Sequence, residues 1–133
     1  MTARAEGTFT VTSWAEDTYQ ELDDKRKLTK ATVSFRLSGG IDADATWTAL
    51  MFYREDGTAE YTGLQVVTGQ IAGHTGTCVM MADGSFTAEG AARSTWQVIP
   101  GSGTGALAGL TGSGTSVATS EPPGTFTLDY ELG

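Results

Sequence analysis

The feature that most constrains the fold of this chain is a period-two alternation of apolar and polar side chains. Residues 28–37 show it clearly, because apolar side chains point to one face at every second position: Ala31, Val33, Phe35 and Leu37. Thr8–Trp14 alternates in the same way, with Phe9 and Val11 on one side. Such alternation is typical of strands with one buried face and not of amphipathic helices. The chain is therefore expected to consist of β-strands.

Short turn signals separate these segments. Gly39-Gly40 supplies the positive φ values of a tight turn, and the Asp56-Gly57 pair in REDGTAEY predicts a hairpin. This hairpin would join antiparallel strands at 45–54 and 59–71, the first of which is apolar on both faces and therefore expected to be covered on both sides.

The rest of the chain divides in the same manner. A second hairpin is expected around Asp83-Gly84, between strands at 77–82 and 85–88. Further strands are expected at 95–99, 115–119 and 125–132. The acidic segment 15–24 is expected to be a solvated loop.

Sequential antiparallel strands with short turns close most naturally into a small barrel, because closure leaves no sheet edge exposed. With 133 residues, the chain is expected to form a single domain, residues 1–133. We therefore predict an all-β fold, a small closed antiparallel barrel of about eight strands. Side chains either fill the interior of such a barrel or leave it open for one small ligand.

The glycine-rich stretch PGSGTGALAGLTGSG, residues 100–114, contains GTGALA and so matches the pattern of dinucleotide-binding loops. That pattern requires a helix after the loop, and Gly109, Gly112 and Gly114 would each cost a helix about 1 kcal/mol. No Gly-Lys-Ser/Thr follows that would make a Walker loop. We therefore interpret the stretch as a hairpin corner, in which Leu107 and Leu110 are the large apolar side chains.

Charge and composition exclude several classes of partner. The formal charge is −8 and the isoelectric point about 4.4, which disfavours nucleic acid and anionic membranes. One cysteine, Cys78, and one histidine, His74, leave no soft-metal site, and we expect no metal and no cofactor. The chain has neither an apolar run near eighteen residues nor a secretion signal, so a cytoplasmic protein is expected.

The order of motifs along the chain resembles a bacterial family of small uncharacterised domains grouped with the allene-oxide-cyclase-like barrels. The motifs are GTFTVTSWAEDTY, KLTKATVSF, LMFYREDGTAEYTGL, GHTGTCVMMADGSF and PGSGTGALAGLTGSGT, with GTFTLDYEL at the end. The resemblance implies an eight-stranded barrel, often oligomeric, whose relatives include plant allene oxide cyclase and the dirigent proteins. Those proteins steer ring closure or coupling of an apolar molecule mostly by shape.

At two places this chain departs from the pattern of that family. Gln65 stands where the family usually has a glutamate, and Met81-Ala82 replaces a polar pair. If these positions line the barrel, its interior is more apolar and less acidic than that of the relatives. An acid or base role at these positions is therefore in question.

The residues expected inside the barrel come from three neighbouring strands. Trp47, Met51 and Tyr53 lie on the first, Tyr61 and Gln65 on the second, and Met81 lies across from them on the third. Trp14, Trp47, Met51, Met81 and Trp96 are the predicted substrate-binding residues. The predicted catalytic groups are Tyr53, Tyr61 and Gln65, which offer hydrogen bonds, and Glu16, placed by a loop over the mouth. Core filling is the alternative for the apolar members, and a solvated surface position is the alternative for Glu16.

Three functions follow for such a barrel. The leading hypothesis is a cofactor-independent cyclase or isomerase that holds an apolar or aromatic small molecule, since positioning alone can supply up to roughly 7–11 kcal/mol. The alternatives are a carrier without chemistry and a structural homo-oligomer with a filled barrel. The last is favoured if Phe9, Phe35, Leu50 and Phe52 form a large exposed stripe that pairs between subunits.

Overall fold

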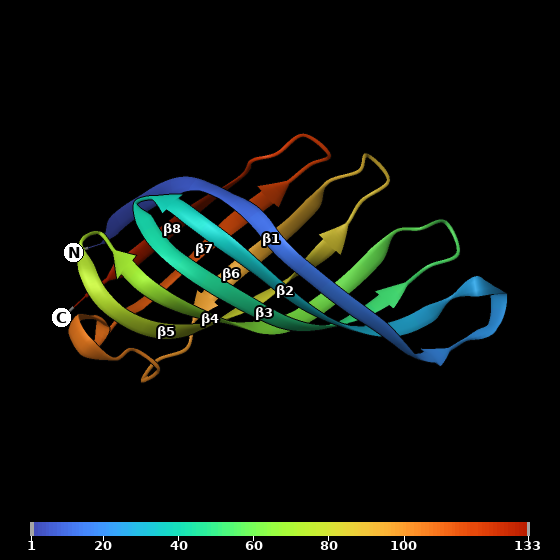
Figure 1. Ribbon diagram of the computed structural model, residues 1–133, viewed down its shortest axis with the longest axis horizontal. Coiled ribbons are helices and arrows are strands. Elements are labelled where there is room, and N and C mark those ends of the chain that lie inside the picture. The colour runs from blue at the N-terminus through green and yellow to red at the C-terminus, as the bar shows by residue number, and fades with distance from the viewer. Residues whose placement is uncertain (1, 133) are drawn as a thin grey trace.

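The computed structural model describes residues 2–132, whose strands close into one antiparallel barrel (Figure 1). The strands follow one another in space as in the sequence, and β8 pairs back onto β1. Their bounds are β1 (Ala3–Glu21), β2 (Lys27–Gly39), β3 (Ile41–Tyr53), β4 (Ala59–Ile71), β5 (His74–Phe86), β6 (Ala92–Val98), β7 (Thr111–Ala118) and β8 (Gly124–Glu131). Two 3₁₀ turns, η1 (Asp23–Lys25) and η2 (Gly105–Leu107), are the only helical elements of the described part. The expected all-β barrel is confirmed.

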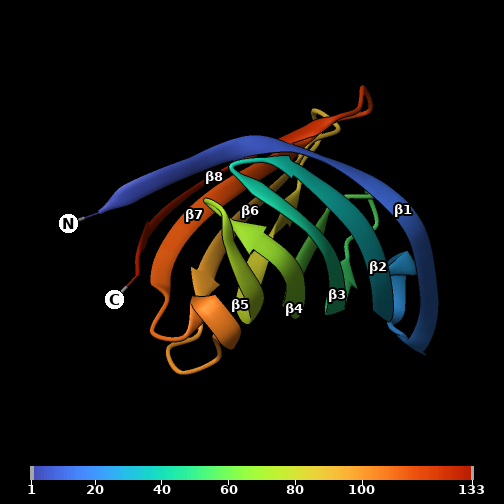
Figure 2. The ribbon, with the colours of Figure 1, turned by 60° about the vertical axis from the view of Figure 1, so that its left-hand side comes forward.

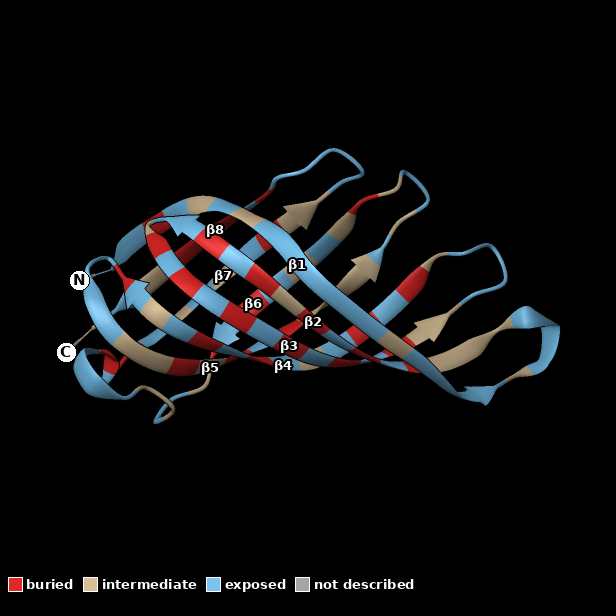
Figure 3. Cartoon of the chain, viewed as in Figure 1, coloured by how far each residue is buried: buried red, intermediate tan, exposed pale blue. Residues whose placement is uncertain are grey.

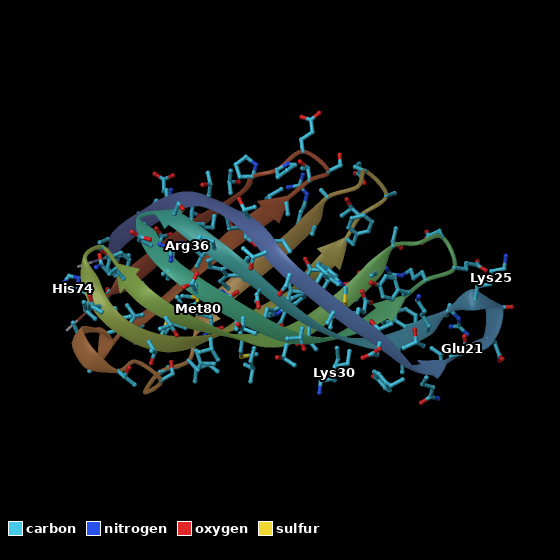
Figure 4. All side chains as sticks on the ribbon, viewed as in Figure 1. Glu21, Lys25, Lys30, Arg36, His74 and Met80 are labelled. Atoms are coloured by element: carbon cyan, nitrogen blue, oxygen red, sulfur yellow. The ribbon has the colours of Figure 1, made fainter. Side chains whose placement is uncertain are left out.

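The connections between strands lie at two ends of the barrel. One end, which we call the mouth end, carries four hairpin loops: residues 22–26, 54–58, 87–91 and 119–123. The opposite end, which we call the closed end, carries the turns at 40 and 72–73 and the connection 99–110 (Figures 1 and 2). Figure 4 shows Glu21 and Lys25 at the mouth end and His74 at the closed end.

The seam that closes the barrel is short. β1 pairs with β8 only from Ala3 to Phe9, whereas its ladder with β2 continues as far as Glu21. Beyond the seam, β1 and β2 continue as a ribbon that extends past the other strands at the mouth end (Figure 1). The β1–β8 ladder therefore lies at the closed end and stops short of the mouth end. On the opposite side β5 pairs with β6 only from Met80 to Phe86, and the connection 99–110 lies along the rest of β5 at the closed end.

Burial alternates along the strands as the sequence pattern predicts (Figure 3). On β2 and β3 almost every second residue faces the interior and is buried, and its neighbours are exposed. Lys30, on the outer face of β2, is exposed (Figure 4). Half of the buried positions of β3 are alanine: Ala43, Ala45 and Ala49.

The glycine-rich stretch fills the closed end. It connects β6 to β7, and its two leucines, Leu107 and Leu110, are almost completely buried against the core. The Thr104 hydroxyl holds the stretch onto β5, where it accepts a hydrogen bond from the Thr77 backbone N–H. A Cβ at Gly76 would lie 2.0 Å from the Thr104 carbonyl oxygen, so only glycine allows this approach. The stretch is a corner, as expected, and it also plugs the barrel.

Two sequence expectations about β1 and β5 are wrong. The acidic segment 15–24 is mostly strand, because β1 runs to Glu21 with β2 as its partner. Asp83-Gly84 is not a turn either, since β5 runs through both residues to Phe86. Gly84 serves packing instead, because a Cβ there would lie 2.0 Å from the Arg93 carbonyl oxygen on β6.

Two adjacent valines of β4 test the alternation of burial. Val67 is 1% exposed in the core and Val66 is 48% exposed on the outer face. Val67→Ala is expected to lower the free energy of unfolding by about 2 kcal/mol, since it removes buried methyl groups and leaves a cavity. Val66→Ala, which changes strand propensity equally, should cost less than about 1 kcal/mol. Urea denaturation measures both, and equal losses would contradict the assigned faces.

Candidate functional site

A cavity of about 280 Å³ opens within the barrel toward the mouth end. Side chains of β1 to β7 line it, and many of them are aromatic: Phe9, Trp14, Phe35, Trp47, Tyr53, Tyr61, Phe86 and Trp96. The cavity exists because small residues occupy the inner positions of β6 and β7 near the mouth, among them Ala92, Ser94, Ser116 and Ala118. Leucine, isoleucine and methionine fill the closed end, so the barrel is filled at one end and open at the other.

A β-bulge in β1 shapes the rim of this cavity. Val11 pairs with Phe35, and the next pairs are Ser13 with Ser34 and Trp14 with Val33, so Thr12 is an extra residue. The insertion shifts the alternation by one position. As a result, Trp14 and Glu16 face the interior side. If the same sequence paired without a bulge, alternation from Phe9 and Val11 would place Ser13 and Ala15 there instead.

Three hydrogen bonds hold the Glu16 carboxylate at the mouth. Trp14 Nε1 donates to Glu16 Oε1 over 2.9 Å, while Thr29 Oγ1 and Tyr53 Oη donate to Oε2 over 2.6 and 2.7 Å. Burial raises the pKa of Glu16, but these hydrogen bonds and the charge of Lys27 outweigh that effect and lower it overall. Glu16 therefore stays ionised at neutral pH.

Tyr53 links this carboxylate to the cavity, which its ring lines. Burial, and then its hydrogen bond to Glu16, raise the pKa of Tyr53, so its phenol stays protonated and donates to the carboxylate. The Lys27 ammonium lies over the Tyr53 ring, 5.1 Å from its centroid. The Tyr53 proton is engaged in the hydrogen bond to Glu16, so the phenolic oxygen keeps its lone pairs for a donor in the cavity.

Trp47, Tyr61 and Gln65 form a deeper wall. The Trp47 and Tyr61 rings meet edge to face with centroids 5.0 Å apart. Trp47 Nε1 donates to the Ala82 carbonyl over 3.1 Å, and the Tyr61 hydroxyl lies 2.7 Å from Ser94 Oγ. Gln65 is 1% exposed, and its Nε2 lies 3.5 Å from Met80 Sδ. The Trp47 indole, the Tyr61 hydroxyl and Gln65 Nε2 thus each have a partner without any ligand.

The structure brings together most of the residues predicted from the sequence. The cavity is lined by seven of them, Trp14, Trp47, Met51, Tyr53, Tyr61, Gln65 and Trp96, and Glu16 is hydrogen-bonded to two of these. The expectation for Met81 is wrong. It is 41% exposed and faces Leu64 on the outer surface, because Met80 takes the interior position opposite Gln65.

Sequence reasoning missed part of the site. Phe9, Val33 and Phe35 line the cavity, and the alternation that placed them on inner faces could have assigned them to it. The position of Phe9 and Phe35, whose rings are 5.7 Å apart, also means that the exposed stripe imagined with Leu50 and Phe52 does not form. Ser94, Ser116 and Thr29 carry no signal in the sequence, since only the strand register brings them to the site.

The rest of the described chain offers no competing centre of chemistry. Cys78 is buried, and burial raises the pKa of its thiol to about 11, so it is not a nucleophile at neutral pH. No three or more His, Cys, Asp or Glu residues of the described part are grouped so that they could hold a metal ion. Within residues 2–132, none of the helices is long and apolar enough to cross a membrane.

Comparison with known proteins identifies relatives of this barrel. The model of a family described as "Protein of unknown function (DUF3224)" matches residues 5–130. The chain is also similar to the crystal structure of a DUF3224-family protein of unknown function from Shewanella oneidensis MR-1. That similarity has a TM-score of 0.84 at 21% identity and covers 100% of this chain and 99% of that one, so it shows the fold alone. A comparison with curated proteins gives no match.

The lowered pKa of Glu16 predicts how stability depends on pH. Because the folded-state pKa lies below the unfolded one, the ionised carboxylate stabilises the protein above the unfolded value, and this stabilisation is lost as the pH falls through the folded value. Glu16→Gln should therefore lower the free energy of unfolding by about 1 kcal/mol near pH 7. The difference from the parent protein should shrink as the pH falls below 4.5, the ordinary pKa of a glutamate. Urea denaturation at several pH values measures it, and a deficit that does not depend on pH would contradict the assignment.

Proposed function

Since the chain belongs to the DUF3224 family, whose description assigns no activity, we propose a function from its cavity: the barrel binds one apolar or aromatic small molecule at its mouth end. One observation carries this proposal. The cavity of about 280 Å³ stays open although the other end of the same barrel is filled with side chains. That volume lies near the lower limit of ordinary ligand sites, which suits a compound of one or two rings.

The walls of the cavity favour binding without large rearrangement. Trp47, Tyr61 and Trp96 are already fixed by ring contacts and hydrogen bonds, so a ligand would not have to order them. Such preformed aromatic walls bind apolar compounds with little loss of side-chain entropy. Tyr53, Ser94 and Gln65 supply the few polar atoms that would orient the bound molecule.

Ring closure or isomerisation is the chemistry that the resemblance to allene-oxide-cyclase-like barrels implies. It is supported by the character of the cavity, which offers a shape and few polar groups, as steering of a flexible substrate requires. Tyr53, Tyr61, Gln65 and Glu16 are the groups that we propose for orientation or proton transfer. A carrier uses the same cavity but returns its compound unchanged, so chromatography of the recovered ligand separates the two functions.

A filled-cavity variant tests the proposed binding. We expect compounds from a panel of apolar and aromatic molecules to stabilise the protein, by about 2.7 kcal/mol at a hundred times the dissociation constant. Ala118→Trp places an indole at the rim of the cavity and should abolish the shift in melting temperature. Thr115→Trp, on the outer face of the same strand, should leave it intact. If no compound of a broad panel stabilises the parent protein, the proposal fails.

We also propose that the barrel forms a homo-oligomer through one outer face, as expected from the resemblance. Exposed apolar side chains gather on the outer faces of β3, β4 and β5, and we call three of them the outer patch: Leu50, Leu64 and Met81. Leu64 lies directly opposite Met81 in the β4–β5 ladder, so the patch is continuous. Two copies of such a patch can cover each other about a two-fold axis.

Analytical ultracentrifugation tests this association. The parent protein is expected to sediment as an oligomer, and Leu64→Lys should shift it to the monomer, because a charge in the middle of the outer patch opposes its burial. Thr115→Lys, which adds the same charge on β7 away from the patch, should leave the oligomer unchanged. A monomeric parent protein would overturn this part of the proposal.

A further inference from the structure

We infer that the ligand carries a protonated amine, whose ammonium group binds Glu16 at the mouth while its apolar body fills the cavity. The inference rests on the proposed function and names the class of ligand that the cavity would select. It is built on the Glu16 carboxylate, the aromatic rings beside it and the charge of the surrounding loops.

The Glu16 carboxylate has room for one more donor. A carboxylate accepts about four hydrogen bonds, and Glu16 receives three, two of them on Oε2 and one on Oε1. Both Trp14 and Tyr53, which hold it, line the cavity. The remaining lone pair of Oε1 is therefore the acceptor that we assign to an ammonium group at the rim.

Among residues 2–132, Glu16 has no ion-pair partner. None of the ion pairs formed by the described residues includes it, although Arg4, Arg36 and Arg54 each pair with an acid elsewhere. Lys27 is the nearby cation, and its ammonium lies over the Tyr53 ring without forming an ion pair with Glu16. A carboxylate at the rim of an apolar cavity gains most from a ligand that supplies the missing positive charge.

The rings next to Glu16 suit a cation as well. One face of the Tyr53 ring already carries the Lys27 ammonium, so Trp14 is the ring left for a ligand cation. Trp14 is 52% exposed although it lines the cavity, which leaves part of its indole free for contact. An ammonium between a carboxylate and exposed aromatic rings combines an ion pair with cation–π attraction.

The loops around the mouth favour the approach of a cation. All four hairpin loops carry acidic residues, which outnumber the basic Lys25, Arg26 and Arg54: Asp23, Asp24, Glu55, Asp56, Glu89 and Glu121. Arg54 is already paired with Glu60. Together with the net charge of −8, this excess of carboxylates attracts cationic ligands to the mouth and repels anionic ones.

Three probes that share one apolar body test the inference: phenylbutylamine, phenylbutanol and phenylbutyrate, titrated calorimetrically at about pH 7, where the amine is protonated. The amine should bind the parent protein at least about tenfold more tightly than the alcohol, and the acid most weakly. Glu16→Gln should reduce the affinity for the amine to about that for the alcohol and leave the alcohol unchanged. Asp17→Asn is the matched control, since it removes a charge from the exposed residue next to Glu16. This variant should still bind the amine more tightly than the alcohol.

The outcomes separate this inference from the proposed function. Equal binding of the three probes would overturn the ammonium site and keep the ligand cavity. Tightest binding of phenylbutyrate would do the same, and it would assign the head group of the ligand to Lys27. If compounds of the apolar panel bind but phenylbutylamine does not, the inference is wrong and the cavity stands. If the panel and all three probes fail, the proposed function falls too. A cooperative urea transition for Glu16→Gln establishes that the variant is folded.

Discussion

The backbone pairing of β1 with β8 determines the shape of everything else in this barrel. It closes the sheet over Ala3–Phe9 and then ends, while β1 continues along β2 to Glu21. At the closed end the strands therefore surround a core that leucine, isoleucine and methionine fill. At the mouth end they diverge around small inner side chains, and the space between them is the cavity. The barrel is thus divided into a filled core at the closed end, which stabilises the fold, and a cavity at the mouth end, which can bind a ligand.

The two regions also differ in how they treat polar groups. The filled region contains almost none, whereas the cavity holds a few that satisfy one another, such as the Tyr61 hydroxyl and Ser94. At the rim, Glu16 binds three neutral donors and no cation of the protein. An ionised group whose hydrogen-bond donors are all neutral, with Lys27 nearby but not paired to it, remains attractive to a cation from solution. The site is therefore folded without a ligand and still selective for one.

Much of this fold follows from the sequence, because period-two alternation alone assigns the inner faces of β2 and β3 correctly. It also places Trp47, Tyr53, Tyr61 and Gln65 toward the interior, where the structure has them. Alternation cannot detect a β-bulge such as the one at Thr12, and the acidic residues of 15–24 resemble a loop although they pair with β2. In β5 the residues Cys78–Ala82 are apolar on both faces, so alternation does not decide between Met80 and Met81. Asp83-Gly84 matches the sequence pattern of a hairpin turn. In the structure, Gly84 instead allows the β6 backbone to approach β5 closely, because it has no side chain. Where the interior is empty depends on the sizes of side chains from several strands at once, so it is visible only in three dimensions.

The extra residue Thr12 in β1 has a consequence for how such a mouth can evolve. A substitution at Trp14 or Glu16 changes one group at the rim, whereas deletion of Thr12 would remove the bulge and keep Trp14 opposite Val33 and Glu16 opposite Ala31, both on the interior side. The length of β1 can thus vary by one residue at this point without exchanging the groups at the rim. Related barrels can therefore differ by one inserted or deleted codon here and still present the same two side chains.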